Sequence, residues 1–290
     1  VSEMFYNRFW QGLVICVRGN GKTKCTLAPR NHLKSTVCGQ HGILWRSLRC
    51  PAERTTIRCV TGSLARKFMK PIAAPFEYNK DFMRLFGNLI GEKRKDAWST
   101  EQIQFAIPHE HRRGVDPTVQ VAGAETDLTG THWDCGVADD VVAKSNSGTA
   151  TLLEGTRELI ADMHAQRDAG SRFNVNGTRW HQDDAYSPIV GKPGINEWSG
   201  TLAKYSCFFV ATVLDGDDSK NEAGEYNHPV PRMDNGLEIT RLGYGKPIWP
   251  EGFPMSRIEE TRAGIIRDYH WYGQYFNQHI GTSSCIFDRT

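Results

Sequence analysis

The chain carries a lysine and a hydroxyl side chain that are placed as in loops that bind nucleotide phosphates. Such loops follow the pattern G-x-x-x-x-G-K-[ST], in which backbone N–H groups surround the phosphates, the lysine contacts them and the hydroxyl binds Mg²⁺. Ala28, Leu33, Lys34 and Ser35 keep this spacing, but the two glycines are replaced by residues whose Cβ atoms restrict positive φ. Taken alone, the segment fits a surface turn before a helix better than a nucleotide site.

Two adjacent carboxylates follow a short apolar stretch further along the chain. Asp139 and Asp140 come directly after segment 135–138. Nucleotide hydrolysis requires a carboxylate that holds Mg²⁺ and a base that orients water. Asp139 is placed for the metal and Asp140 for the water. An isolated Asp-Asp pair is more often a turn or a helix cap, so its order after the lysine and serine is what gives it weight.

A third polar motif, Gly177-Thr178-Arg179, follows another apolar stretch. Thr178 could sense the γ-phosphate, and Arg179 could contact a phosphate or stabilise a loop. A simple turn with Arg179 stacked on Trp180 is the alternative interpretation. We favour the functional one only because the three motifs occur in this order.

The elements that must position these motifs alternate between short apolar runs and helical stretches, as in an α/β protein. We predict strands at 13–17, 24–28, 56–61, 102–107, 119–122, 134–142 and 171–176, and helices at 36–49, 63–73, 150–166 and 256–266, the last with Ser256 as N-cap. Open α/β sheets bind ligands beyond the carboxyl ends of their strands. The three motifs are therefore expected at one edge of a sheet.

The composition excludes several classes of protein. A chain of 290 residues with 39% hydrophobic and 23% charged residues is typical of a globular protein, and no stretch approaches the roughly 20 apolar residues that span a bilayer. The net charge of +2 gives no global case for nucleic-acid binding. The N-terminus does not resemble a signal peptide, and it lacks an initiator Met, so we expect a piece of a longer protein.

The cysteine and histidine patterns do not predict a structural metal site. The eight cysteines include no Cys-x-x-Cys pair, which predicts reduced cytosolic thiols rather than a zinc ribbon or a disulfide framework. The segment His109-Glu110-His111 has metal-binding side chains, but alternate residues of a polar loop rarely chelate a metal.

Together the motifs resemble one family, the large terminase subunit of tailed bacteriophages, the ATPase that drives DNA into a procapsid. Segment 29–36, PRNHLKST, is similar to the degenerate phosphate loop of many members. Segments 129–146 and 177–184 resemble the region of the second nucleotide motif and the segment after it. Late in the chain, IWPE at 248–251 and QYFNQ at 274–278 are similar to the family stretches "wPe" and "QYlnnP".

The resemblance implies a three-layer P-loop NTPase of the ASCE, RecA-like class, with a mainly parallel central sheet and a small C-terminal lid subdomain. Residues 1–188 would form the ATPase core, and residues 189–290 the remainder with the lid. Asp140 would activate water, Thr178 would couple hydrolysis to movement, and Arg30 matches an arginine finger that acts in cis or in trans. The residues implied to bind ATP are Pro29, Arg30, Asn31, His32, Leu33, Lys34, Ser35 and Thr36, with Ser35 and Asp139 holding Mg²⁺.

The implied activity is ATP-driven translocation of double-stranded DNA. The implied partners are the portal protein and the small terminase subunit, and the implied assembly is a homo-oligomeric ring on the procapsid in the host cell cytoplasm, with no membrane. Members usually continue into a nuclease domain, for which this chain has no room. Its acidic cluster at 215–218 is interpreted as a loop, so no nuclease activity is expected.

Two other functions remain open on the sequence alone. Another P-loop translocase, such as a helicase, would need a second RecA-like domain, and nothing after residue 188 repeats the first half. A non-catalytic assembly protein with a decayed phosphate loop would explain the missing glycines. The adenine pocket is expected among the aromatic residues and Gln11 of segment 5–11, although a hydrophobic helix face is the interpretation that we favour for that segment.

Overall fold

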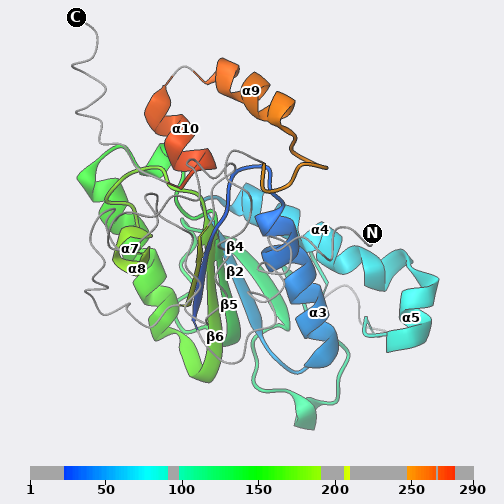
Figure 1. The fold of residues 1–290 in the computed structure, drawn as a ribbon. Coiled ribbons are helices and arrows are strands. Elements are labelled where there is room, and N and C mark those ends of the chain that lie inside the picture. The colour runs from blue at the N-terminus through cyan, green and yellow to red at the C-terminus, as the bar shows by residue number, and fades with distance from the viewer. Residues whose placement is uncertain (1–22, 91–97, 191–205, 210–246, 266, 278–290) are drawn as a thin grey trace, which may run out of the picture.

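The computed structural model of the chain describes residues 23–90, 98–190, 206–209, 247–265 and 267–277 (Figure 1). In chain order the described elements are β1 (Lys24–Leu27), η1 (Ser35–His41), α3 (Gly42–Arg49), β2 (Thr55–Cys59), α4 (Gly62–Tyr78), α5 (Lys80–Phe86), β3 (Gln102–Ile103), η2 (His109–His111), β4 (Val119–Gly123), β5 (Trp133–Asp139), η3 (Lys144–Asn146), α7 (Ala150–Ala165), β6 (Arg167–Gly177), α8 (Ser187–Val190), β7 (Ser206–Phe209), α9 (Met255–Gly264) and α10 (Asp268–Tyr275).

The described strands form one sheet of seven, in the order β3-β4-β2-β5-β6-β1-β7. Every neighbouring pair is parallel except β3 with β4, which is antiparallel at the sheet edge. Parallel neighbours require crossover connections, and helices provide several of them. The predicted α/β class with a mainly parallel sheet is confirmed.

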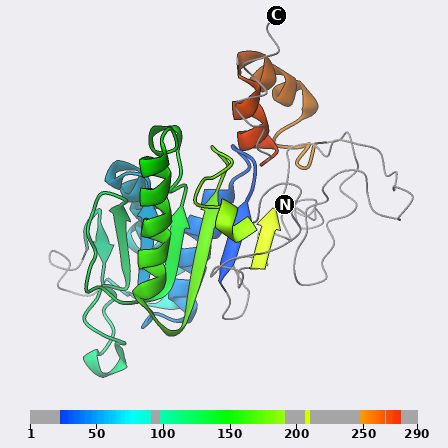
Figure 2. The same ribbon diagram turned by 90° about the vertical axis from the view of Figure 1, so that its left-hand side faces the viewer.

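Helices cover both faces of this sheet. The helices α3 and α4 lie on one face, and α7 lies on the other (Figure 1 and Figure 2). Figure 2 shows the strands pointing toward the end of the molecule that carries α9 and α10. The carboxyl ends of the parallel strands and the C-terminal helices therefore lie toward the same end of the molecule.

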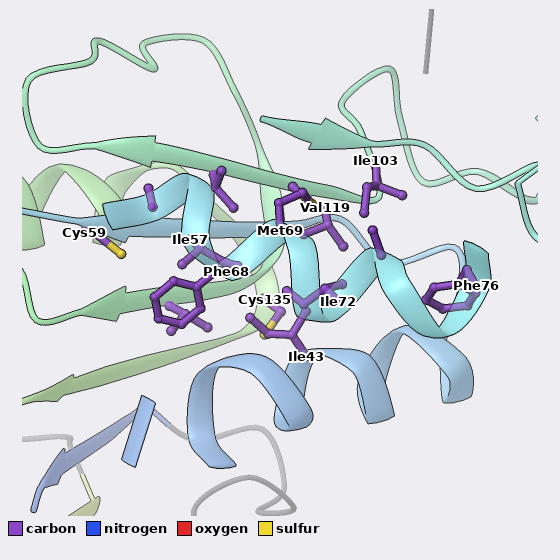
Figure 3. Packing of buried hydrophobic residues seen from close by; sticks show 14 of the residues in the cluster. Ile43, Ile57, Cys59, Phe68, Met69, Ile72, Phe76, Ile103, Val119 and Cys135 are labelled. Carbon is purple, nitrogen blue, oxygen red and sulfur yellow. The ribbon is translucent and has the colours of Figure 1, made fainter. Parts of the chain in front are cut away.

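The first core lies between α3, α4 and the strands β2, β4 and β5. Its side chains come from every second residue of the strands, because successive residues of a strand point to opposite faces. On α4 they recur every three or four residues, so they lie on one face of the helix. Figure 3 shows this packing, in which the labelled residues are Ile43, Ile57, Cys59, Phe68, Met69, Ile72, Phe76, Ile103, Val119 and Cys135. The second core, under α7, includes Trp133, Ile160, Met163, Phe173 and Val175.

The helix α4 is longer than the sequence indicates. Thr61 caps it, since the Thr61 side chain accepts a hydrogen bond from the Leu64 N–H, and the helix continues past Pro71 and Pro75 to Tyr78. A proline removes a helical hydrogen bond and is expected to end a helix. Here the apolar face continues with Phe76, which is 1% exposed, and burial of that face outweighs the lost bond.

The C-terminal helices form a small cluster of their own around Phe253, Ile258, Trp271, Tyr275 and Phe276. The predicted cap of the first of these helices is wrong. Pro254, rather than Ser256, is the N-cap of α9, and no side chain caps it. Proline has a fixed φ that is compatible with a helix start. Because the helix begins at Met255, Ser256 is already its second residue and cannot be the residue that precedes it.

No described helix is long and apolar enough to cross a membrane. Cys25, Cys38, Cys50, Cys59 and Cys135 are all free thiols. The predicted strand at 13–17 lies outside the described residues.

The close packing of η1 against α4 predicts that a larger side chain at Gly39 clashes with Phe68 and lowers stability. A Cβ atom at Gly39 would lie 2.5 Å from Cε1 of Phe68. We expect Gly39→Ala to lower the free energy of unfolding by about 1–2 kcal/mol, because overpacking costs more than alanine gains in a helix. Urea unfolding monitored by circular dichroism measures this change.

Two further variants make that prediction specific. A Cβ atom at Gly155 of α7 would have no heavy atom within 4 Å beyond its own helix and chain neighbours, so Gly155→Ala should be neutral or stabilising. In a Phe68→Leu background the cost of Gly39→Ala should shrink. Additive effects at Gly39 and Phe68 would contradict the proposed clash.

Candidate functional site

The loop between β1 and η1 adopts a backbone that normally needs glycine. Asn31 and Leu33 have φ angles of 65° and 56°, in the left-handed region that a Cβ atom disfavours. Leu33 stands where the phosphate-loop pattern has its second glycine, and its side chain is 39% exposed. The loop therefore has the conformation of a glycine-containing loop without the glycine.

The helix after this loop presents its N-terminus to the carboxyl edge of the sheet. The segments η1 and α3 run from Ser35 to Arg49 without a break. The first N–H groups of a helix have no partner within it. Across the described ranges no acceptor is found for the N–H groups of Lys34, Ser35 and Thr36. Three backbone donors at a helix N-terminus form an environment that suits an anion.

Lys34 and Ser35 each contact one of the two aspartates at the end of β5. Lys34 Nζ lies 2.9 Å from Asp140 Oδ2, and Ser35 Oγ donates a hydrogen bond of 2.7 Å to Asp139 Oδ2. Lys34 and Asp139 are buried. The structure thus brings together the four residues to which the sequence assigned the phosphates, the metal and the water.

The neighbouring strand β6 supplies Asn176, which the sequence analysis did not single out. Its Nδ2 donates to Asp139 Oδ1 over 3.2 Å, and its carbonyl accepts the Asp140 N–H at 2.9 Å. Asp140 has a φ of 46°, where the chain leaves the strand. The only sequence signal for Asn176 was its position just before Gly177, at the end of a predicted strand.

The charges at this site are unbalanced. Burial and then the charge of Asp140 raise the pKa of Asp139 to about 7. Burial opposes the charged form of Lys34, but the charges of Asp140 and Asp139 outweigh it and raise the pKa of Lys34. Two carboxylates face one ammonium, so an additional cation would be favoured here.

The available donors suit magnesium better than zinc. The described part of the chain holds no group of three or more His, Cys, Asp and Glu side chains that could hold a metal. Mg²⁺ needs no such group, because one or two carboxylates, water and substrate phosphates complete its shell. Ser35 and Asp139, already 2.7 Å apart, are hard oxygen donors of this kind. His109 and His111 lie in the exposed turn η2.

Thr178 and Arg179 follow the end of β6 at the same edge. Thr178 is buried. Arg179 is 2% exposed, and it donates to Asp184 Oδ2 at 2.9 Å, to Ser187 Oγ at 2.7 Å and to two loop carbonyls. Of the two functional roles considered for Arg179, these contacts correspond to loop stabilisation.

Arg30 is attached to the C-terminal helix α10. The Arg30 N–H donates to the Gln274 carbonyl, and Arg30 Nη1 donates to Gln274 Oε1, each over 2.9 Å. Just beyond α10, Asn277 Nδ2 donates to the Leu27 carbonyl at 3.0 Å. A cavity of about 500 Å³ adjoins Arg30 and is lined by residues of α9 and α10. The end of β1 and the first part of the loop that follows it are thus tied to residues near position 275.

His32 belongs to the packing between the loop and the C-terminal segment. Its ring centroid lies 4.8 Å from that of Phe253 and 6.1 Å from that of Trp249, and its Nδ1–H donates to the Arg30 carbonyl at 2.8 Å. Burial lowers the pKa of His32 to about 4, and the charge of Lys34 acts in the same direction. The His32 side chain therefore belongs to the packed core. Any contact of His32 with a phosphate would have to come from its backbone.

Several predicted features fall on other parts of the chain. The expected adenine-pocket segment 5–11, the acidic cluster at 215–218 and Gln278 lie outside the described residues.

No protein-family model matches the chain, and no curated protein matches it.

The strained loop predicts that adding the missing glycine stabilises the protein. We expect Leu33→Gly to raise the free energy of unfolding by roughly 1 kcal/mol, because glycine relieves the left-handed strain at an exposed position. Leu152 in α7 is 42% exposed, so Leu152→Gly is a matched control and should lower stability by about 1 kcal/mol. A loss of stability at both positions in urea unfolding would show that Leu33 is not strained.

The lowered pKa of His32 predicts that the folded protein loses stability when the pH falls. Its pKa falls from 6.5 to about 4 on folding, so the unfolded chain binds the proton first and stability decreases as the pH falls through this window. From pH 7 to pH 5 the loss is about 2 kcal/mol. His32→Phe should remove that part, leaving the contribution of His164, whose pKa burial also lowers to about 4. Equal pH slopes in wild type and variant would contradict the assignment.

Proposed function

We propose that this chain is the ATP-hydrolysing motor domain of a viral terminase large subunit, which drives double-stranded DNA into a procapsid. The observation that carries the proposal is the meeting of Lys34, Ser35, Asp139 and Asp140 at one helix N-terminus. A cation, a hydroxyl, two carboxylates and free backbone N–H groups are the parts that phosphoryl transfer from a nucleotide requires.

The order of the strands supports a P-loop fold of the ASCE class. The strand β1 precedes the loop, β5 ends at Asp139 and is followed by Asp140, and β6 lies between β1 and β5. One strand separates the phosphate-loop strand from the acidic strand in that class. The loop with Lys34 and Ser35 and the pair Asp139 and Asp140 also meet at the carboxyl edge of the sheet, which is where open α/β sheets generally bind ligands.

In this proposal each residue has one task. Lys34 and the N–H groups of Ser35 and Thr36 bind the phosphates, and Ser35 and Asp139 hold Mg²⁺, which would neutralise phosphate charge. Asp140 Oδ2 holds Lys34 in the described state, so phosphates must compete for that ammonium. Asp140 Oδ1 has no hydrogen-bond partner among the described residues and is the oxygen left to accept a proton from the attacking water.

The DNA-packaging part of the proposal is supported by the resemblance of the motifs. It includes a homo-oligomeric ring, the portal protein and small terminase subunit as partners, and a location in the host cytoplasm at the procapsid. Thr178 would couple hydrolysis to movement. Arg30 would act as the arginine finger, and it would first have to leave Gln274, which holds it now.

ATP binding and hydrolysis test the proposal directly. We expect Lys34→Ala to lose ATP binding, because the phosphates lose their cation. Asp140→Asn should bind ATP at least as tightly as wild type, since it releases Lys34, but should hydrolyse it roughly 10²–10⁴-fold more slowly without its base. Equilibrium titration with ATP and Mg²⁺ and a phosphate-release assay measure the two effects.

Lys67→Ala provides a matched control, because Lys67 is an exposed lysine of α4, a helix that contributes no residue to the proposed site. It should behave as wild type. Hydrolysis by Lys34→Ala and Asp140→Asn at the wild-type rate would refute the assignment. Wild-type protein that fails to bind ATP at millimolar concentration would favour a non-catalytic assembly protein, and unwinding of duplex DNA would favour a helicase.

A further inference from the structure

Asn176 contacts both aspartates of the candidate site, through two different groups. Its side-chain Nδ2 donates to Asp139 Oδ1, and its main-chain carbonyl accepts the N–H of Asp140. Asp139 and Asn176 are directly opposite each other on the parallel strands β5 and β6. One residue therefore sets the orientation of the first carboxylate and the direction in which the chain turns to the second.

The Asn176 amide presents its nitrogen to Asp139. The ionised form of a carboxylate, which is the form that binds a metal, accepts hydrogen bonds and donates none, so a donor at this position favours that form. The Asn176 side chain is 0% exposed, and its Oδ1 has no hydrogen-bond partner among the described residues. A buried acceptor without a partner is unfavourable, so packing alone would favour an apolar residue at this position.

The strand itself gives no reason for an asparagine here. Asparagine is depleted in strands, where β-branched side chains pack better. Asn174, two residues earlier on the same face of β6, is opposite Val137 rather than an aspartate and is only partly buried. The difference between these two asparagines is the carboxylate that Asn176 faces.

We infer that Asn176 is a positioning residue that holds the Asp139 carboxylate in the orientation required to bind Mg²⁺ with a nucleotide. Ser35 holds Asp139 Oδ2 at 2.7 Å, and Asn176 holds Oδ1, so the carboxylate is fixed from two sides. Partners that orient a metal-binding carboxylate commonly change metal affinity 10–100-fold when they are removed. The inference rests on the proposed ATPase function, because that function provides the metal.

The test measures metal binding without turnover. Mn²⁺, which reports by electron paramagnetic resonance, is titrated into the chain saturated with a non-hydrolysable ATP analogue. Asn176→Val should weaken Mn²⁺ binding 10–100-fold. Asn174→Val, the matched control on the same strand face, should bind Mn²⁺ as wild type does. Binding of the analogue in EDTA should be the same in all three proteins, since among the described residues Asn176 forms no hydrogen bond with Lys34, Ser35 or Thr36.

A second variant separates positioning from folding. Asn176→Thr replaces the amide donor with a hydroxyl donor on a side chain that suits a strand. It should therefore lose less Mn²⁺ affinity than Asn176→Val. This comparison also holds when circular dichroism shows that the valine variant folds poorly. Two results would overturn this inference and leave the proposed function standing. One is an Mn²⁺ affinity of Asn176→Val within twofold of wild type. The other is a loss of Mn²⁺ affinity in Asn176→Thr and in Asn174→Val equal to that in Asn176→Val. Wild-type protein that binds neither analogue nor Mn²⁺ would overturn the proposed function as well.

Discussion

The buried ammonium of Lys34 is the charge around which the carboxyl edge of the sheet is organised. A buried cation is tolerated only when it is paired, and Asp140 provides the pair at 2.9 Å. The pairing is possible because β5 ends beside the N-terminus of η1, which also brings Ser35 to Asp139. The positions of the helix, the loop and two strand ends are therefore interdependent.

The loop keeps its conformation through contacts with distant residues. Residues in left-handed conformations persist only where their surroundings determine them. Here Gln274 binds Arg30, Asn277 binds the Leu27 carbonyl, and Phe253 packs against His32. These contacts hold the loop from outside, whereas glycines would have allowed its shape at no steric cost. The C-terminal segment is thus a structural part of the candidate site.

The sequence predicted what depends on local pattern. The α/β class, most strands and the helix α7 follow from apolar periodicity, and the order of motifs predicted that Lys34 and Ser35 would approach Asp139 and Asp140. It did not predict the burial of His32, or the contacts of Gln274 and Asn277, because these join residues more than 200 positions apart. The extension of α4 through Pro75 was missed because tertiary burial overrides a local helix breaker.

The short strand β7 has a consequence for how the chain can be divided. It pairs with β1 on the side opposite β6, so the strand that leads into the loop is internal to the sheet. A fragment that ended at residue 188 would leave β1 with a row of unpaired N–H and C=O groups beside the buried residues Cys25 and Leu27. Such an edge can pair with another chain and aggregate. Residues 206–209 therefore protect the loop strand from self-association.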